Sequence, residues 1–159
     1  MGKASIILAS DLFKTPVMSR RSVTHMAPML NGIGLAVADM ATSLSFYRRL
    51  GLEFPAGAEN EPHAEAELPG GLRLMIDTHA SIASFDPDHR AGGAIKDGPS
   101  LAFVCADPAE VDSVHADLVA AGHTSESAPW DAPWGQRYAQ VQDPDGNIVD
   151  LFAWSAANN

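Results

Sequence analysis

Hydrophobic and polar positions along residues 31–77 predict one complete β-α-β-β-β unit. Larger apolar residues occupy alternate positions of residues 33–38, as expected for a strand. Asp39 then offers an N-cap to a helix whose apolar stripe recurs every three or four residues and ends at Gly51. Three further strand segments follow, at residues 52–54, 63–68 and 72–77, the last two joined by a tight Pro-Gly-Gly turn.

The same order of elements recurs in the second half of the chain. Asp107 and Pro108 predict the start of a second helix, and Gly122 predicts its end. The other predicted elements are a strand at 101–105, a short strand near His123, a loop at 128–134, and a hairpin of strands 136–142 and 148–154 around Asp-Pro-Asp-Gly.

The internal repeat predicts an α+β fold built from two βαβββ modules, residues 31–77 and 100–155, in one compact domain. The modules are expected to pair their curved sheets into an incomplete barrel whose concave face forms a ligand cup. Residues 78–99 form a connector rich in Gly and Asp. Residues 1–30 are predicted to be an arm outside the domain, either a loosely attached, flexible leader or a segment that exchanges with a partner subunit.

Composition narrows the classes of partner. Twenty Asp and Glu oppose ten Lys and Arg, a net charge of −10, which argues against binding to nucleic acid or to an anionic membrane and favours cationic ligands. A single cysteine excludes an intrachain disulfide and fits a reducing compartment, so a cytoplasmic location is expected. No apolar run approaches the length of a transmembrane helix.

Two motifs resemble those of a known superfamily. Residues 37–52 contain Val-Ala-Asp followed by Ser-Phe-Tyr-Arg-Arg-Leu-Gly-Leu, and residues 143–152 are Asp-Pro-Asp-Gly-Asn-Ile-Val-Asp-Leu-Phe. Both resemble the vicinal-oxygen-chelate superfamily, which contains glyoxalase I, extradiol dioxygenases and bleomycin-resistance proteins. The resemblance covers residues 31–154 and implies the paired-module fold described above.

A narrower resemblance concerns four short segments: Pro-His-Ala-Glu-Ala at 62–66, Gly-Gly-Leu-Arg-Leu at 70–74, Phe-Asp-Pro at 85–87, and Pro-Trp-Asp-Ala-Pro-Trp-Gly-Gln-Arg-Tyr at 129–138. These segments look like those of mitomycin-resistance-type drug-binding proteins. The resemblance implies a protein that sequesters a drug without transforming it, and that acts as a homodimer with sites between modules.

The positions that carry metal ligands in other members of this superfamily lack suitable donors here. Position by position they are Gly32, Met75, Ser100 and Asp150, of which only Asp150 coordinates a divalent metal well. A shift of two residues along the strand would replace Met75 by Asp77 and would still leave two carboxylates. No metal or other cofactor is therefore expected. The alternative is a divalent metal ion held by Asp150 with Asp77 or His63 recruited, or one held by His63, Glu65 and Glu67, which alternate along one strand face.

Aromatic residues before the closing hairpin are the candidates for ligand binding. Trp130 and Trp134 bracket a proline-rich segment; one of the two is expected to close the end of the barrel and the other to stack on a planar ligand, and the preferred hypothesis assigns the stacking to Trp134. His63 is the expected opposite wall. The full set of candidate ligand-binding residues is Trp134, His63, Trp130, Asp150, Asp77, Met75, Phe85 and Tyr138, and no catalytic residue is predicted.

The sequence therefore predicts a metal-free binding protein for a planar aromatic drug or metabolite. The small residues Gly32, Gly34 and Ala36 would leave room for the ligand, and Asp77 and Asp150 would accept hydrogen bonds from an amine or amide. Two alternatives remain. One is a metal-dependent lyase, isomerase or dioxygenase, and the other is an interaction module whose cup is filled by its own side chains.

Overall fold

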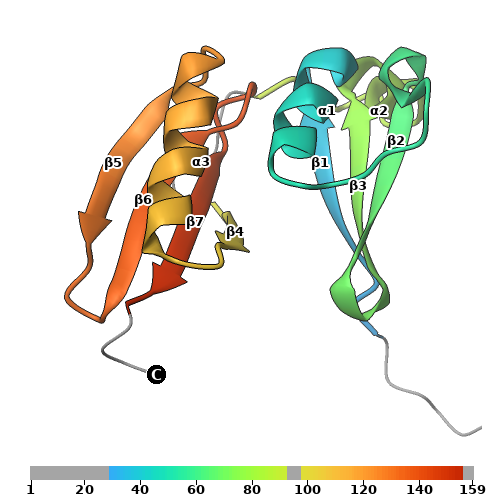
Figure 1. The fold of residues 1–159 in the computed structure, drawn as a ribbon. Helices are drawn as coiled ribbons and strands as arrows, with labels where there is room; N and C mark the ends of the chain where they lie inside the picture. Colours follow the sequence, from blue (N-terminus) through green and yellow to red (C-terminus); the bar gives the residue numbers. More distant parts are fainter. Residues whose placement is uncertain (1–28, 93–97, 156–159) are drawn as a thin grey trace, which may run out of the picture.

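The computed structural model describes residues 29–92 and 98–155, and these form two sheets that stand side by side, each with its own helix (Figure 1). The first sheet has the strand order β1-β3-β2, with β3 parallel to β1 and antiparallel to β2. Its elements are β1 (Gly32–Val37), α1 (Met40–Arg49), the short 3-10 turns η1 (Ala58–Asn60) and η2 (Pro69–Gly71), β2 (His63–Leu68) and β3 (Leu72–Thr78).

The second sheet has the order β4-β7-β6-β5. Its elements are β4 (Leu101–Val104), α3 (Pro108–Ala120), β5 (Ser125–Asp131), β6 (Gln136–Gln142) and β7 (Ile148–Trp154), and a further helix, α2 (His79–Phe85), directly follows β3. The parallel pair β4–β7 corresponds to β1–β3, so the predicted repeat is confirmed in three dimensions. The α+β class is likewise confirmed.

Local sequence signals account for both long helices. The Asp39 side chain accepts a hydrogen bond from Thr42 N at 2.7 Å, and the Asp107 side chain accepts one from Glu110 N at 2.8 Å. Each carboxylate thereby satisfies a backbone donor that the first helical turn leaves free. One face of each sheet is buried beneath its helix, through Leu74 and Ile76 in the first and Val149 and Leu151 in the second.

Two predictions about individual elements, for residues 52–54 and 128–134, are wrong, and the connector contains a helix that was not predicted. Residues 52–54 form no strand, so the first sheet has three strands rather than four. The connector contains α2, a seven-residue helix capped by Thr78, which is too short to produce a clear periodic pattern. The predicted loop 128–134 is partly strand: β5 continues to Asp131, and its irregular register with β6 hides the two-residue alternation.

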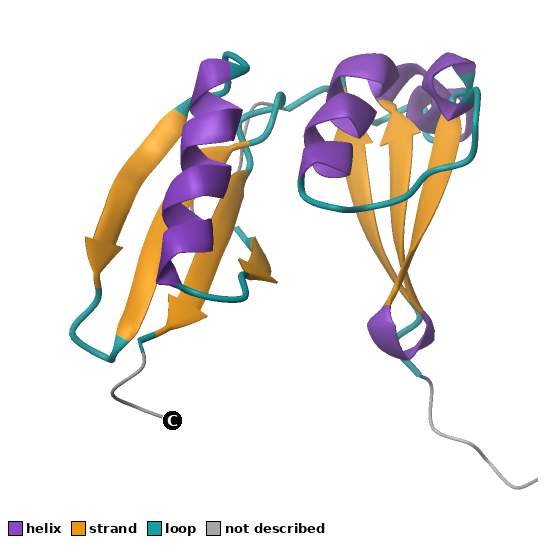
Figure 2. Cartoon of the chain, in the orientation of Figure 1, coloured by secondary structure: helices purple, strands orange, loops and turns teal. Residues whose placement is uncertain are grey.

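The two sheets remain separate and do not close into a barrel (Figure 2). Most of the predicted arm, residues 1–28, lies outside the described residues, as do residues 93–97 of the connector. Within the described ranges, no helix has the length and hydropathy needed to cross a membrane.

The two modules meet where α1 contacts the β6–β7 turn. Tyr47 is fully buried, and its hydroxyl donates to Asp143 Oδ2 at 2.7 Å. Asp145 of the same turn accepts from Ala38 N at 2.8 Å. Burial and the Asp143 charge both raise the pKa of Tyr47 above its usual value, so the phenol stays neutral and remains a donor.

Replacing Tyr47 by Phe tests the importance of this contact. Hydrogen bonds to charged groups contribute about 1.5–3 kcal/mol, so Tyr47→Phe is expected to lower the free energy of unfolding by about that amount. Urea denaturation followed by circular dichroism measures the change. As a control, Arg49→Gln breaks the exposed ion pair with Asp117 and is expected to cost less than about 1 kcal/mol. Equal effects of the two substitutions would contradict a special role for Tyr47.

Candidate ligand site

The face of the second sheet that is not covered by α3 carries an aromatic cluster. Side chains alternate along a strand, so Tyr138 on β6 and Phe152 on β7 share this face, directly opposite one another in the register. Trp130 on β5 is opposite Tyr138 on its other side. Trp134 lies in the turn between β5 and β6. We call the four side chains Trp130, Trp134, Tyr138 and Phe152 the aromatic wall.

Ring contacts hold the aromatic wall together around Tyr138. Its ring centroid lies 5.1 Å from that of Trp130, 5.8 Å from that of Trp134 and 6.2 Å from that of Phe152. These separations lie within the range of favourable aromatic contacts. The Trp134 indole is 54% exposed, and its Nε1 donates to Gln136 Oε1 at 2.7 Å. An indole fixed in this way presents a flat apolar surface to solvent.

Asp150 supplies a fixed carboxylate beside the aromatic wall. The residue is buried, and its two oxygens accept from Ser100 Oγ at 2.5 Å and from Gln140 Nε2 at 2.9 Å. Burial and the neighbouring Asp150 charge raise the pKa of Tyr138, so its phenol also stays neutral near pH 7. The second sheet therefore combines an apolar surface with a hydrogen-bond acceptor held by its neighbours.

The corresponding face of the first sheet is polar and charged. His63 Nδ1 lies 2.9 Å from Asp77 Oδ1, and His63 Nε2 lies 3.2 Å from Glu65 Oε1. Arg73 Nη1 donates to both Glu65 oxygens, at 3.0 and 2.8 Å. Met75 is on the same face, opposite Glu65 in the β2–β3 register. The hydrogen bond to Asp77 is the main cause that raises the pKa of His63, and Glu65 adds to it.

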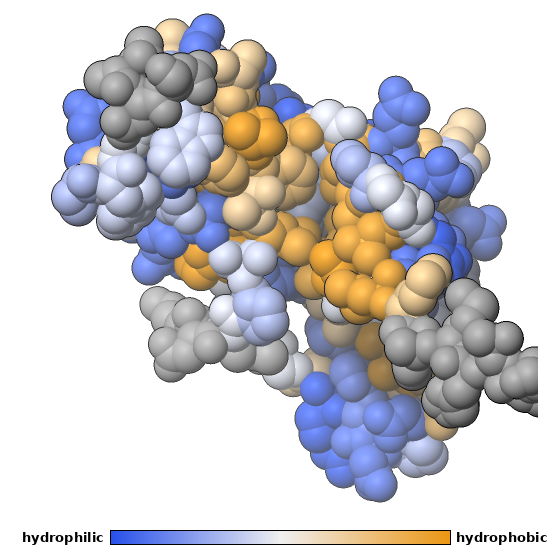
Figure 3. All heavy atoms as spheres, turned by 90° about the horizontal axis from the view of Figure 1, so that it is seen from below, coloured by the Kyte–Doolittle hydropathy of each residue, from blue (hydrophilic) through white to orange (hydrophobic). Residues whose placement is uncertain are grey.

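An apolar hollow of about 520 Å³ separates the two modules. Ile33, Leu68 and Leu72 line it on the first module, and Leu101 and Phe103 line it on the second. Figure 3 shows apolar side chains gathered between the two halves of the molecule when it is viewed from below. This hollow contains neither the aromatic wall nor His63, although Ser100, which donates to Asp150, also lines it.

The structure divides the predicted site residues between the two sheets. It brings Trp130, Trp134, Tyr138 and Asp150 together, which the sequence could only suggest. His63, Asp77 and Met75 share a face of the other sheet. Among the described residues, no hydrogen bond or ring contact joins His63 to Trp134. A ligand held between these two side chains therefore stays a prediction.

Phe85 is placed apart from both groups. It ends α2 and is 72% exposed.

Three residues of the site were missed by the sequence analysis: Phe152, Gln140 and Arg73. Strand alternation could have identified two of them. Phe152 lies two residues from Asp150 and Gln140 two residues from Tyr138, so each shares a strand face with a residue that was predicted.

The donor chemistry at the four superfamily metal positions does not fit a divalent cation. Gly32 has no donor, and a Cβ added there would lie 2.7 Å from Met75 Cε. Met75 offers only a thioether, and the Ser100 hydroxyl is bound to Asp150. Across residues 29–92 and 98–155, no three His, Cys, Asp or Glu side chains are grouped as metal ligands would be.

Comparisons with known proteins establish the family. The model of the Glyoxalase/Bleomycin resistance protein/Dioxygenase superfamily matches residues 25–151, and the chain belongs to this superfamily. A glyoxalase/bleomycin resistance protein/dioxygenase from Nocardioides is 25% identical, with a TM-score of 0.64 over 86% of this chain and 90% of that one. No curated protein matches the chain.

Two further solved structures share the fold at lower identity. A glyoxalase-related enzyme from Fulvimarina pelagi is 21% identical, with a TM-score of 0.66 over 80% of this chain and 88% of that one. Lactoylglutathione lyase from Agrobacterium tumefaciens is also 21% identical, with a TM-score of 0.55 over 80% and 94% of the two chains.

The pKa of His63 is a direct test of the charged cluster on the first sheet. A raised pKa in the folded state means that the stabilisation is fully present below about pH 6.5 and is lost as the pH rises through the folded pKa. NMR titration of the ring protons is expected to give a pKa above about 6.5 for His63. Asp77→Asn removes the carboxylate that is the main cause of the raised pKa, so the pKa of His63 should fall in this variant.

His115 serves as the internal reference in this titration. Burial lowers the pKa of His115, and Asp77 is not among the causes of its shift, so Asp77→Asn should leave it unchanged. A His63 that titrates at or below its ordinary value in the unsubstituted protein would contradict the cluster.

Proposed function

We propose that this protein binds a planar aromatic small molecule without a metal ion and does not transform it. The observation that carries the proposal is the aromatic wall beside the buried, doubly hydrogen-bonded carboxylate of Asp150. Sequestration of an aromatic or quinone antibiotic is the biological role that fits, in agreement with the resemblance to mitomycin-resistance-type proteins.

Stacking on Trp134 supplies the main attraction for the ligand. Its indole is exposed on one side and fixed by Tyr138 and Gln136 on the other, so little side-chain entropy is lost on binding. Asp150 supplies direction, because an amine or amide of the ligand can approach a carboxylate that Ser100 and Gln140 already orient. The net charge of −10 favours a ligand that carries such amines.

We further propose that the complete site forms in a homodimer. Each chain carries one aromatic face and one charged face, and within a chain His63 and Trp134 are on different sheets. A second copy that placed its first sheet over the aromatic wall would bring a His63 opposite Trp134. The imidazole, held by Asp77 and Glu65, would then form the second wall of the site.

The competing function is metal-dependent catalysis. It is favoured by the name of one structural neighbour, lactoylglutathione lyase, and by the cluster of ionisable groups around His63. The donor set at Gly32, Met75, Ser100 and Asp150 speaks against it, because a catalytic divalent ion usually has at least three strong protein ligands. Enzyme activity is therefore the second candidate.

Trp134→Ala tests the proposed function. With mitomycin C and a panel of quinone and polycyclic aromatic antibiotics as probes, a binding ligand should quench the tryptophan fluorescence of the unsubstituted protein. The variant should lose most of that quenching and bind about tenfold or more weakly, since one stacked ring contributes on the order of 1–3 kcal/mol. Because the side chain is half exposed, the circular dichroism spectrum should not change.

Phe85→Ala is the matched control, since it removes an exposed aromatic residue that lies outside the aromatic wall. Its affinity for the same probe should equal that of the unsubstituted protein. Undiminished affinity in Trp134→Ala would refute the stacking model, and so would equal losses in the two variants.

A further inference from the structure

The first sheet has two edge strands, β1 and β2, and comparison with the second sheet singles out the β2 edge. Strand β2 is the last in the order β1-β3-β2, and none of the described residues pairs with its outer side. In the second sheet the equivalent position beside β6 is occupied by β5. Residues 51–62, which would correspond to β5, pass β2 without forming a strand. The first module therefore lacks the fourth strand that the second module has.

The backbone groups on this edge can be assigned from the register. Thr78 N donates to Pro62 O at 3.0 Å, and bonded and non-bonded residue pairs alternate along an antiparallel ladder. The N–H and C=O groups of His63, Glu65 and Glu67 therefore point away from β3, toward the open edge. Such a row of three donors and three acceptors is a template for another extended segment.

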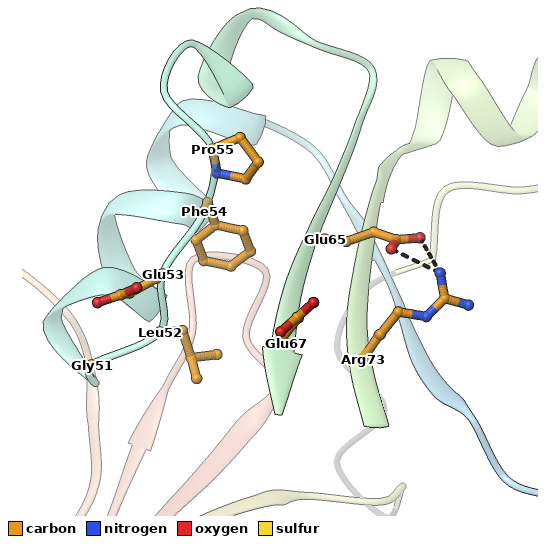
Figure 4. Close-up of a pocket in the computed structure, with 8 residues that line it drawn as sticks. All are labelled: Gly51, Leu52, Glu53, Phe54, Pro55, Glu65, Glu67 and Arg73. Carbon is orange, nitrogen blue, oxygen red and sulfur yellow. Dashed lines mark hydrogen bonds and ion pairs between the residues drawn. The ribbon is translucent and has the colours of Figure 1, made fainter. Parts of the chain in front are cut away.

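A groove runs along the same edge. It consists of two adjoining hollows of about 660 and 450 Å³, which share Pro55 and Glu65. Figure 4 shows Leu52 and Phe54 pointing from residues 51–55 toward β2, with Glu67 at the far end of the strand. The groove thus offers both a backbone edge and apolar side chains to an extended segment.

Charge indicates what kind of segment fits. The lining carboxylates are Glu53, Glu61, Glu65 and Glu67. Two basic side chains also line the groove, and both are already paired: Arg73 with Glu65 and Asn31, and His63 with Asp77 and Glu65. Residues 1–28 carry four of the ten basic residues of the chain and one of its twenty acidic residues, a net charge of +3 against −13 for the rest.

Residues 1–28 join the first sheet at the start of β1, and this position brings them within reach of the β2 edge. Gly32, Arg73 and Glu67 lie in one row across the sheet, so the chain enters β1 level with the end of β2. A strand added to β2 would lie three strand spacings from β1, about 14 Å. The seven residues 25–31 can span up to about 23 Å when extended, which is sufficient.

We propose that residues 17–24 of the chain add to the open edge of β2 as a further strand of the first sheet. This segment contains Val17, Val23 and Thr24, which favour extended backbone, and the adjacent pair Arg20 and Arg21. Neighbouring residues of a strand face opposite sides, so one of the two arginines lies on the face of Glu65 and Glu67. The added strand gives the first module the same four-stranded form as the second.

Amide hydrogen exchange of the full chain, resolved by residue with NMR, tests this inference. The amides of Glu65 and Glu67 should exchange at least about tenfold more slowly in the unsubstituted protein than in the variant Arg20→Glu/Arg21→Glu. The control Lys3→Glu/Lys14→Glu makes the same change in charge outside the docked segment and should retain the protection. The amides of Val149 and Leu151 report that each variant is folded.

A second variant makes the charge pairing specific. Adding Glu67→Arg to Arg20→Glu/Arg21→Glu restores opposite charges across the edge and should recover most of the protection. Fast exchange of Glu65 and Glu67 in the unsubstituted protein would overturn the proposal, as would equal loss of protection in the lysine control. Protection that grows with protein concentration would assign the edge to a second copy and would also overturn docking within the chain.

Discussion

The buried contact between Tyr47 and Asp143 is the constraint on which the arrangement of the two modules depends. Asp143 accepts from the Tyr47 hydroxyl at 2.7 Å, and it also holds its own turn through Asp145 N and Asn147 N at 3.0 and 2.8 Å. A buried carboxylate is tolerated because these donors replace its lost hydration. The turn so formed then presents Asp145 to Ala38 N, at the end of β1. One motif thus closes the second hairpin and binds the first module.

Because side chains alternate along a strand, each sheet has two chemically different faces. The residues that face the helices are small or aliphatic, such as Ala64, Ala66, Val149 and Leu151, and they form the core. The residues between them face away from the helices and carry the chemistry. On the second sheet they form the aromatic wall and Asp150, and on the first they form the ionic network of His63. Within residues 29–92 and 98–155 the sheets do not close over one another, so neither of these faces is covered by the other sheet.

The sequence was sufficient where local signals agree. The closing hairpin was predicted at its observed limits because alternation and the Asp-Pro-Asp-Gly turn coincide, and α1 was predicted because Asp39 and Gly51 mark its two ends. The wrong strand assignments lie where strand formation depends on pairing with residues distant in the sequence. Residues 52–54 look like a strand but have no partner, and Trp130 belongs to a strand whose irregular register with β6 hides its pattern. Sequence order alone assigns His63 to the first module and Trp134 to the second, but the separation of the two sheets is set by contacts such as Tyr47–Asp143, which no periodicity records.

The function proposed for the aromatic wall and Asp150 is to bind a planar ligand without a metal ion. Isothermal titration calorimetry with mitomycin C, or with the tightest probe of the antibiotic panel, tests it most directly when the protein is first treated with a chelator and then supplied with Mn²⁺, Zn²⁺ or Ni²⁺. We expect the same affinity in all of these conditions and recovery of the probe chemically unchanged. Binding that appears only after a divalent metal is added, or conversion of the probe in its presence, would contradict it.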